Sequence, residues 1–219
     1  MIEGEFYDYA YFEEGLKSGK SLYENYRWLP NLTLPLAEEI LQVARRSPSF
    51  SKISNPVILD YGCAKGYLVK AMNILGVSSY GIDVSSYAIA NCDPDVEELV
   101  VCLDLKRNPY PASWPKPDYI IAKDVLEHHT PTELSHYLKE LHKISSRILV
   151  VVPLGDGEKY FIEEYGNDPS HFIKEDLNWW EGVLTQAGFT VTGTYDVGGL
   201  KATWKDHHQK GNGLLYCSG

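Results

Sequence analysis

From residue 57 to residue 152, short apolar runs alternate with segments in which apolar residues repeat at helical spacing. Five runs have the length of strands, and they cover 57–60, 79–83, 99–104, 118–122 and 147–152. Strands covered by helices on both faces of a parallel sheet are apolar along their whole length, as these runs mostly are. The alternation therefore predicts an α/β fold built on a doubly wound, mostly parallel sheet.

Helices and a final pair of strands complete the predicted fold. The stretch 130–133 offers a threonine N-cap, a proline at the first helical position and a glutamate three residues after the cap. A further helix is predicted at about 175–187. The strand-like stretches 189–197 and 213–217 follow with no helix between them, so we expect them to pair as an antiparallel hairpin.

The first 56 residues differ in composition from the rest, because they are acidic and rich in tyrosine. We interpret residues 1–56 as a cap and residues 57–219 as the core of the same single domain, a size that allows a full hydrophobic core. The cap residues that we expect to close over a ligand and to contact an acceptor are Tyr23, Tyr26, Arg27 and Trp28.

Charge and hydropathy restrict the function and the location of the protein. The formal net charge of −10 argues against tight binding to a phosphate backbone, which needs clustered Lys and Arg. No apolar run approaches 18 residues, and no basic leader precedes an apolar stretch. We therefore expect a soluble, cytoplasmic protein that acts on a small molecule and binds neither nucleic acid nor a membrane.

A turn that contains two glycines, DYGCAKG, joins the first predicted strand to a helix. Glycine at such a turn permits unusual backbone angles and a close approach of the backbone to a ligand, and the following helix N-terminus favours an anionic group. A dinucleotide and S-adenosylmethionine both need such a turn. A dinucleotide site has the pattern G-x-G-x-x-G, whereas Gly62, Ala64 and Tyr67 occupy those positions here, which disfavours a dinucleotide.

The same turn resembles the first motif of the class I S-adenosylmethionine-dependent methyltransferases, D/E-x-G-x-G-x-G, with Ala64 where glycine is usual. Later segments resemble that family in the same order. YGIDVS ends the second predicted strand with Asp83, CLDL ends the third with Asp104, and AKDVLEHH follows the fourth with a D-V-L-E-H segment. The resemblance extends over about residues 55–217.

This resemblance implies a Rossmann-like, seven-stranded, mostly parallel sheet with a C-terminal antiparallel hairpin, and S-adenosyl-L-methionine as the cofactor. It implies that Asp83 accepts hydrogen bonds from the ribose hydroxyls, that Asp104 receives the adenine amino group, and that Leu105 offers a backbone N–H. The implied cofactor-binding residues are Asp60, Gly62, Cys63, Ala64, Gly66, Asp83, Val84, Asp104, Leu105, Lys123 and Asp124.

The expected reaction is a direct displacement at the sulfonium methyl, in which positioning does most of the work and a base helps when the nucleophile is a hydroxyl. The candidate catalytic residues are His128 and Glu127, just after the fourth strand, and His171, from the loop after the fifth. The expected acceptor is a small molecule, such as a sugar or metabolite with a hydroxyl group, and no metal is expected.

Three alternatives stay open at this point. One is a catalytically silent protein that binds S-adenosylmethionine as a sensor or scaffold, and another is an NAD-dependent oxidoreductase. The third is a metal-assisted RNA 2′-O-methyltransferase, because Asp124, Glu127, His128 and His171 resemble the carboxylate and histidine set of small-RNA terminal 2′-O-methyltransferases. Against this third alternative, aspartate replaces the first glutamate of that set, and the chain is acidic.

Overall fold

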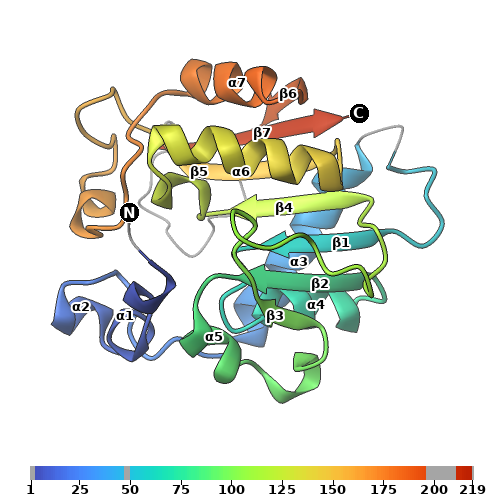
Figure 1. Cartoon of the computed structure of the whole chain (residues 1–219), viewed down its shortest axis with the longest axis horizontal. Coiled ribbons are helices and arrows are strands. Elements are labelled where there is room, and N and C mark those ends of the chain that lie inside the picture. The colour runs from blue at the N-terminus through green and yellow to red at the C-terminus, as the bar shows by residue number, and fades with distance from the viewer. Residues whose placement is uncertain (1–2, 47–49, 196–210, 219) are drawn as a thin grey trace.

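One sheet organises the chain. The structure, a computed structural model, describes residues 3–46, 50–195 and 211–218. Within these ranges seven strands form a single sheet in the order β3-β2-β1-β4-β5-β7-β6 (Figure 1). The strands are β1 (Val57–Tyr61), β2 (Ser78–Asp83), β3 (Val100–Cys102), β4 (Tyr119–Lys123), β5 (Ile148–Pro153), β6 (Thr190–Tyr195) and β7 (Asn212–Ser218).

The first five strands pair in parallel, and β7 pairs antiparallel with both β5 and β6. The predicted sheet and its C-terminal hairpin are confirmed; positions 196–197 of the predicted strand lie outside the described residues. The second strand of the hairpin, β7, takes the inner position beside β5. Residues 212–217 of β7 are buried, whereas Thr192 and Thr194 of β6 are exposed. The more buried strand therefore takes the inner position, and β6 forms the edge of the sheet.

Helices cover both faces of the sheet. In Figure 1, α6 and α7 lie in front of the strands and α3 and α4 lie behind them. In the described ranges, no helix combines the length and the apolar character needed to cross a bilayer. The helices are η1 (Gly4–Phe6), α1 (Tyr9–Phe12), α2 (Gly15–Ser18), α3 (Pro30–Arg45), α4 (Tyr67–Ile74), α5 (Ser86–Ala90), η2 (Pro94–Val96), η3 (Leu126–His128), α6 (Pro131–Ile144), η4 (Glu163–Asn167) and α7 (Leu177–Gln186).

Successive residues of the central strands enter different halves of the core. Ile120 of β4 belongs to the apolar cluster that contains Trp180 of α7. Its neighbour Ile121 belongs to the cluster that contains Ile40 of α3 and Met72 of α4. All five side chains are fully buried. Because both faces of the strand are covered, β4 is apolar and buried from Tyr119 to Ala122, which is the pattern that the sequence predicted.

The N-terminal segment has two parts with different positions. Helix α3 belongs to the layer behind the sheet, whereas residues 3–28 lie beside the carboxyl ends of the parallel strands (Figure 1). The Ser85 hydroxyl donates a hydrogen bond to the Tyr7 carbonyl oxygen, and Lys65 forms a largely buried ion pair with Glu13. These contacts hold residues 3–28 against the loops after β1 and β2.

Helix α6 begins with the predicted capping box. The Thr130 hydroxyl accepts a hydrogen bond from the Glu133 N–H, and the Glu133 side chain accepts one from the Thr130 N–H. We expect Thr130→Ala to lower the free energy of unfolding by about 1 kcal/mol, since the first-turn N–H groups lose their partner. Urea denaturation measures the change. Thr132→Ala, an exposed site in the same turn, is the control and should change stability by less than about 0.5 kcal/mol; equal effects of the two changes would contradict the capping argument.

Candidate functional site

A cleft of about 380 Å³ opens at the carboxyl edge of the sheet. Its walls come from the loops after β1, β2, β3 and β4 and from the N-terminal segment that lies over them. The volume is within the range of small-ligand sites. In open α/β sheets, ligands bind in the crevice at this edge.

The turn after β1 forms the floor of the cleft. Gly62 has a φ of +82°, and a Cβ there would approach Cγ2 of Val125 to 2.5 Å, so a side chain cannot fit. Ala64 has a φ of +49°, the left-handed conformation that strains every residue with a Cβ. Its N–H donates a 2.8 Å hydrogen bond to Oδ2 of Asp83. The turn therefore needs the conformation of glycine at position 64, although alanine occupies it.

Asp83 ends β2 and lines the cleft. Its carboxylate accepts hydrogen bonds from the N–H groups of Ala64 and Ser85, each at 2.8 Å. A carboxylate has about four lone-pair positions, so the two oxygens retain capacity for further donors. Burial raises the pKa of Asp83 above its ordinary value, while these two backbone donors act in the opposite direction.

Asp104 follows β3 and is held in a fixed orientation at the cleft wall. Its Oδ1 accepts hydrogen bonds from the Tyr137 hydroxyl at 2.7 Å and from the Lys106 N–H at 2.9 Å. Its Oδ2 lies 3.4 Å from Nε of Arg107. The neighbouring residue Leu105 is buried in the core on the α6 side of the sheet.

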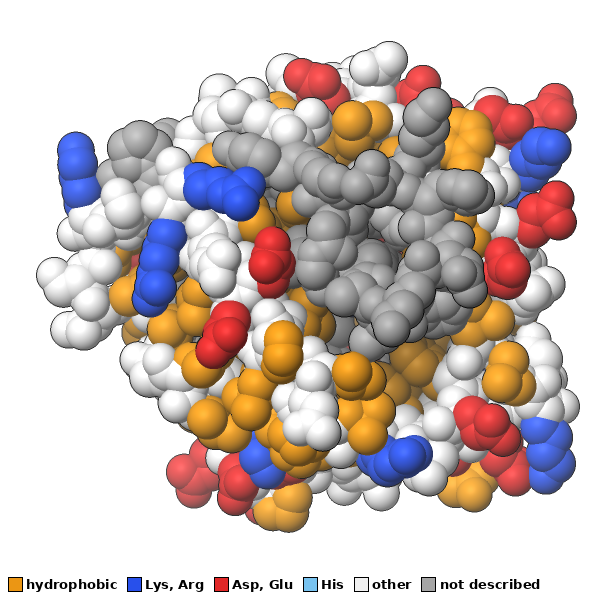
Figure 2. Space-filling model, turned by 180° about the vertical axis from the view of Figure 1, so that it is seen from behind, with side chains coloured by type: hydrophobic (Ala, Val, Ile, Leu, Met, Phe, Trp, Pro, Cys, Tyr) orange, Lys and Arg blue, Asp and Glu red, His pale blue; other side chains and the backbone are white. Residues whose placement is uncertain are grey.

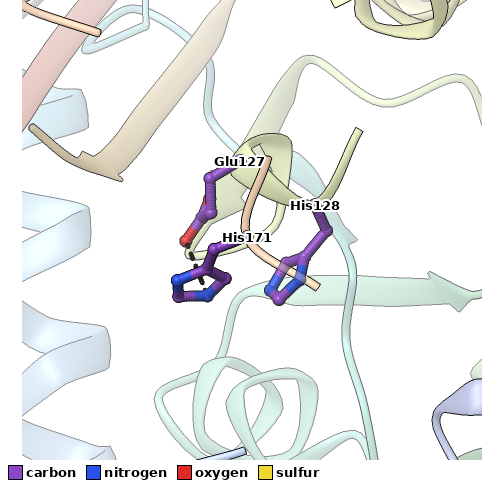
Figure 3. A group of neighbouring side chains, drawn as sticks. All are labelled: Glu127, His128 and His171. Atoms are coloured by element: carbon purple, nitrogen blue, oxygen red, sulfur yellow. Dashed lines mark ion pairs between the residues drawn. The ribbon is translucent and has the colours of Figure 1, made fainter. Parts of the chain in front are cut away.

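Glu127, His128 and His171 form a compact group beside the cleft, here called the His–Glu cluster (Figure 3). Glu127 and His128 lie on η3, after β4, and His171 comes from the segment after η4. One oxygen or nitrogen atom from each side chain lies within 4.8 Å of the other two. Glu127 is 1% exposed, and Oε1 of Glu127 lies 4.0 Å from Nε2 of His171.

Hydrogen bonds determine which nitrogen of each imidazole carries the proton. The Ser170 hydroxyl donates to Asp168, so it accepts the 2.8 Å hydrogen bond from Nδ1 of His128. Nδ1 of His171 donates to the carbonyl oxygen of Tyr165 at 2.9 Å. Burial, followed by the neighbouring His171, lowers the pKa of His128 well below its ordinary value. In the neutral state, both rings therefore carry their lone pair on Nε2.

The structure brings half of the predicted site residues to the cleft surface. Gly62, Ala64, Asp83, Val84, Asp104, Asp124 and His128 line the cleft. The other predicted residues do not line it, and these are Asp60, Cys63, Gly66, Leu105, Lys123, Glu127 and His171.

Asp124 is separate from the His–Glu cluster, although the metal-assisted alternative grouped the four residues. Its Oδ2 accepts a 2.5 Å hydrogen bond from Nζ of the adjacent Lys123. It has a φ of +54°, so the backbone turns sharply after β4 and directs this carboxylate toward the cleft. The cluster among the described residues consists of the other three side chains.

Two tyrosines of the N-terminal segment reach the site and were not among the predicted residues. The Tyr7 ring packs edge-on against the His128 ring, with centroids 5.7 Å apart. The Tyr11 hydroxyl donates a 3.0 Å hydrogen bond to Oδ2 of Asp168. The tyrosine-rich sequence YDYAYF was a signal for an aromatic contact, but Tyr7 precedes helix α1 and Tyr11 lies within it, so helical spacing does not relate the two.

Of the four cap residues that were expected at the site, Tyr23 lines the cleft. Tyr26 packs against the ring of Tyr67, with centroids 5.3 Å apart. Nη1 of Arg27 donates to a backbone carbonyl oxygen at the exposed surface. Nζ of Lys70 lies 5.1 Å from the centroid of the Trp28 ring. These last three side chains therefore pack away from the cleft.

The cleft is strongly electronegative. Among the described residues, six carboxylate side chains and one guanidinium group line it. The guanidinium group, on Arg107, already pairs with Glu3 and Asp104. Such a lining favours ligands that carry positive charge near these groups and disfavours phosphates.

A Rossmann-like sheet with a glycine turn after β1, acids at the ends of β2 and β3, and a cleft between them defines a class I S-adenosylmethionine-dependent methyltransferase. The methyltransferase domain family matches residues 32–194, and the chain belongs to this family. Comparison with curated protein sequences gives no match.

Solved structures share the fold at low sequence identity. Magnesium protoporphyrin IX methyltransferase from Synechocystis, crystallised with SAH, is 16% identical over 85% of this chain and 84% of its own, with a TM-score of 0.58. Mitomycin 7-O-methyltransferase is 14% identical over 84% of this chain and 53% of its own, with a TM-score of 0.58. The [4+2]-cyclase SpnF is 17% identical over 83% of this chain and 79% of its own, with a TM-score of 0.58. Because a cyclase has this fold, the reaction must be argued from the site.

Asp60 provides a test of the buried charge beneath the glycine turn. Burial, reinforced by the charge of Asp83, raises the pKa of Asp60 to about 7. The unfolded chain has the ordinary pKa of 3.8, so the folded state binds the proton more tightly. The stability contribution of this proton is therefore complete below about pH 4 and lost as the pH rises through about 7.

We expect Asp60→Asn to raise the free energy of unfolding at pH 8 by on the order of 2 kcal/mol, and by less at pH 5. Urea denaturation of both proteins at the two pH values measures this difference. Glu98→Gln, an exposed control, should give the same small change at both values. A gain for Asp60→Asn that does not depend on pH would show that Asp60 titrates normally.

Ala64 provides a test of backbone strain in the turn. Ala64→Gly should raise the free energy of unfolding by about 0.5–1 kcal/mol, because glycine adopts a positive φ without steric cost. The control is Ala71→Gly, a fully buried site within α4, where glycine should lower stability by about 1 kcal/mol or more. Destabilisation by both substitutions in urea denaturation would refute the strain at Ala64.

Proposed function

We propose that this methyltransferase transfers the methyl group of S-adenosylmethionine to a hydroxyl group of a small-molecule acceptor. The observation that carries this proposal is the His–Glu cluster beside the cleft. An oxygen nucleophile must lose its hydroxyl proton, and the cluster holds nitrogen and carboxylate lone pairs beside the cleft. His128 is the member of the cluster that lines the cleft.

The cleft contains groups suited to each part of the cofactor. We assign Asp83 to the ribose hydroxyls, and Asp104, two residues after β3, to the adenine amino group, because both carboxylates line the cleft. The turn that contains Gly62 and Ala64 lines the cleft with backbone and a single methyl group, which suits a close approach of the amino-acid portion. The positive sulfonium centre fits an electronegative lining, since six carboxylates of the described residues surround the cleft.

The same charge favours an acceptor without phosphate groups. Figure 2 shows Lys and Arg side chains that are separated on the face behind the view of Figure 1, with no continuous basic field among the side chains described there. A nucleic acid would meet carboxylates at the cleft, with no basic surface on this face to guide it. Similarity in fold to mitomycin 7-O-methyltransferase agrees with a small acceptor whose oxygen is methylated.

The proposed step is a displacement at the methyl carbon. The acceptor oxygen attacks in line with the sulfur, the oxygen–carbon bond forms as the carbon–sulfur bond breaks, and the electron pair of the broken bond stays on sulfur. The hydroxyl proton passes to water on the side of the cleft that His128 lines. S-adenosylhomocysteine and a methyl ether are the products. Asp168 contributes by positioning. It accepts a hydrogen bond from the Ser170 hydroxyl, so the Ser170 oxygen is oriented to accept the hydrogen bond from Nδ1 of His128.

Asp83→Asn tests the cofactor site. We expect it to weaken binding of S-adenosylhomocysteine by about 10- to 100-fold, since hydrogen bonds to a charged group contribute about 1.5–3 kcal/mol. Titration calorimetry with S-adenosylhomocysteine measures the change, and Glu98→Gln, which lies outside the cleft, should bind like the wild-type protein. Unchanged affinity in Asp83→Asn would place the ribose elsewhere.

Transfer itself is tested with methyl-labelled S-adenosylmethionine and a panel of small hydroxyl compounds. Label that appears in a methyl ether supports the proposal. Binding of S-adenosylhomocysteine without transfer to any class of acceptor would favour a sensor or scaffold. Binding of NADH without S-adenosylhomocysteine would favour the oxidoreductase.

A further inference from the structure

We infer that the His–Glu cluster is a binding site for one divalent transition-metal ion, with Oε of Glu127 and Nε2 of His128 and His171 as its ligands. The inference rests on the proposed function, because it specifies how the same cluster acts on the acceptor hydroxyl. Two imidazole nitrogens and one carboxylate oxygen are a donor set that suits Zn²⁺, Mn²⁺, Co²⁺ and Fe²⁺ better than Mg²⁺ or Ca²⁺, which prefer oxygen ligands.

The protonation pattern prepares both histidines for coordination. Nδ1 of each ring donates a hydrogen bond, in one case to Ser170 and in the other to the Tyr165 carbonyl oxygen. The lone pair of each neutral ring therefore lies on Nε2, and for His171 this atom lies 4.0 Å from Oε1 of Glu127. A metal-binding histidine needs this arrangement, in which the second ring nitrogen donates to a carbonyl, hydroxyl or carboxylate group.

The distances within the cluster fit a cation better than a shared proton. Nε2 of His171 lies 4.0 Å from Oε1 of Glu127 and 3.8 Å from Oδ2 of Asp168. These separations exceed a hydrogen bond, whereas a metal with bonds of about 2.0–2.2 Å bridges ligand atoms that are about 3–4 Å apart. The widest separation in the cluster, within 4.8 Å, closes with side-chain rotations that move the atoms by about an ångström.

The backbone holds the ligands on one rigid support. The Phe172 N–H donates a 2.9 Å hydrogen bond to the Glu127 carbonyl oxygen, which ties the His171 segment to η3. Asp168 is 5% exposed, and it accepts hydrogen bonds from the hydroxyls of Tyr11 and Ser170 and from the Ser170 N–H. Together, these bonds fix the ring of His128 and the loop that carries His171.

Charge around the cluster also favours a cation. Asp124 and Asp83 contribute negative charge at the cleft, and Glu127 and Asp168 contribute it behind the wall. Burial of carboxylates this close together costs free energy that a divalent ion offsets.

A metal ion with three protein ligands keeps coordination positions open. The acceptor hydroxyl would occupy one such position from the cleft side of His128. Coordination polarises its O–H bond, the proton passes to water in the cleft, and the oxygen then attacks the sulfonium methyl as described above. The step needs no oxidant or reductant, and the metal keeps its charge throughout.

Cobalt titration tests the site directly. Protein freed of metal with a chelator is titrated with Co²⁺, and the visible absorption of the bound ion is followed. We expect one Co²⁺ per chain, with an affinity that falls by at least tenfold in each of Glu127→Gln, His128→Asn and His171→Asn. His136→Asn, which removes an exposed histidine on α6, is the control and should bind like the wild-type protein.

Two further measurements keep the outcomes distinct. S-adenosylhomocysteine binding is measured on every variant, and circular dichroism shows whether each variant is folded. The number of Co²⁺ ions bound per wild-type chain tests the site even if a variant fails to fold. Absence of Co²⁺, Mn²⁺ and Zn²⁺ binding to the wild-type protein, or binding that all three substitutions leave unchanged, overturns the metal site. If S-adenosylhomocysteine binding persists in that case, the cofactor site stands without the metal. If S-adenosylhomocysteine itself fails to bind, the proposed function fails first.

Discussion

Two-sided burial of the parallel strands is the constraint on which the rest of the structure depends. Because helices cover both faces, polar side chains are excluded from the strand interiors and gather where the strands end. In parallel strands these ends lie at one edge, so Asp83, Asp104 and Asp124 lie around one cleft although about 20 residues separate each from the next. Asp60 is an exception among the described carboxylates, since it lies within β1, and burial raises its pKa to about 7.

Several carboxylates at one edge repel each other, and the structure reduces this repulsion in different ways. Asp83 accepts hydrogen bonds from two backbone N–H groups, and Asp104 accepts one from a tyrosine hydroxyl. Asp124 forms an ion pair with Lys123. The backbone donors to Asp83 and the hydroxyl donor to Asp104 are neutral, so they stabilise these carboxylates without removing their negative charge, whereas the Lys123 ammonium offsets the charge of Asp124. The cleft therefore remains suited to the positively charged sulfonium of the cofactor. The same negative charge would also favour the proposed divalent ion in the His–Glu cluster.

Local and periodic features of the fold were predictable from the sequence, and long-range contacts were not. The five parallel strands, the hairpin and the capping box at Thr130 each follow from residues that are close in sequence. The inner position of β7 depends on its pairing with both β5 and β6, and so on contacts between segments that are far apart in the sequence. The hydrogen bond from His128 to Ser170 spans 42 residues, and that from Tyr11 to Asp168 spans 157, so no spacing rule indicates them. A tyrosine-rich segment indicates an aromatic wall, but only packing decides which rings face the ligand.

The N-terminal segment connects the cofactor side of the cleft to the His–Glu cluster. Tyr7 packs against His128, and Tyr11 binds Asp168, which orients His128 through Ser170. The same segment is attached to the loop after β2 by the hydrogen bond from the Ser85 hydroxyl to the Tyr7 carbonyl oxygen, close to Asp83, for which we propose ribose binding. A ligand that changes the position of these rings would therefore change the orientation of the imidazole. The fold is shared with a cyclase, so the sheet alone does not determine the reaction, which depends on the side chains at the site.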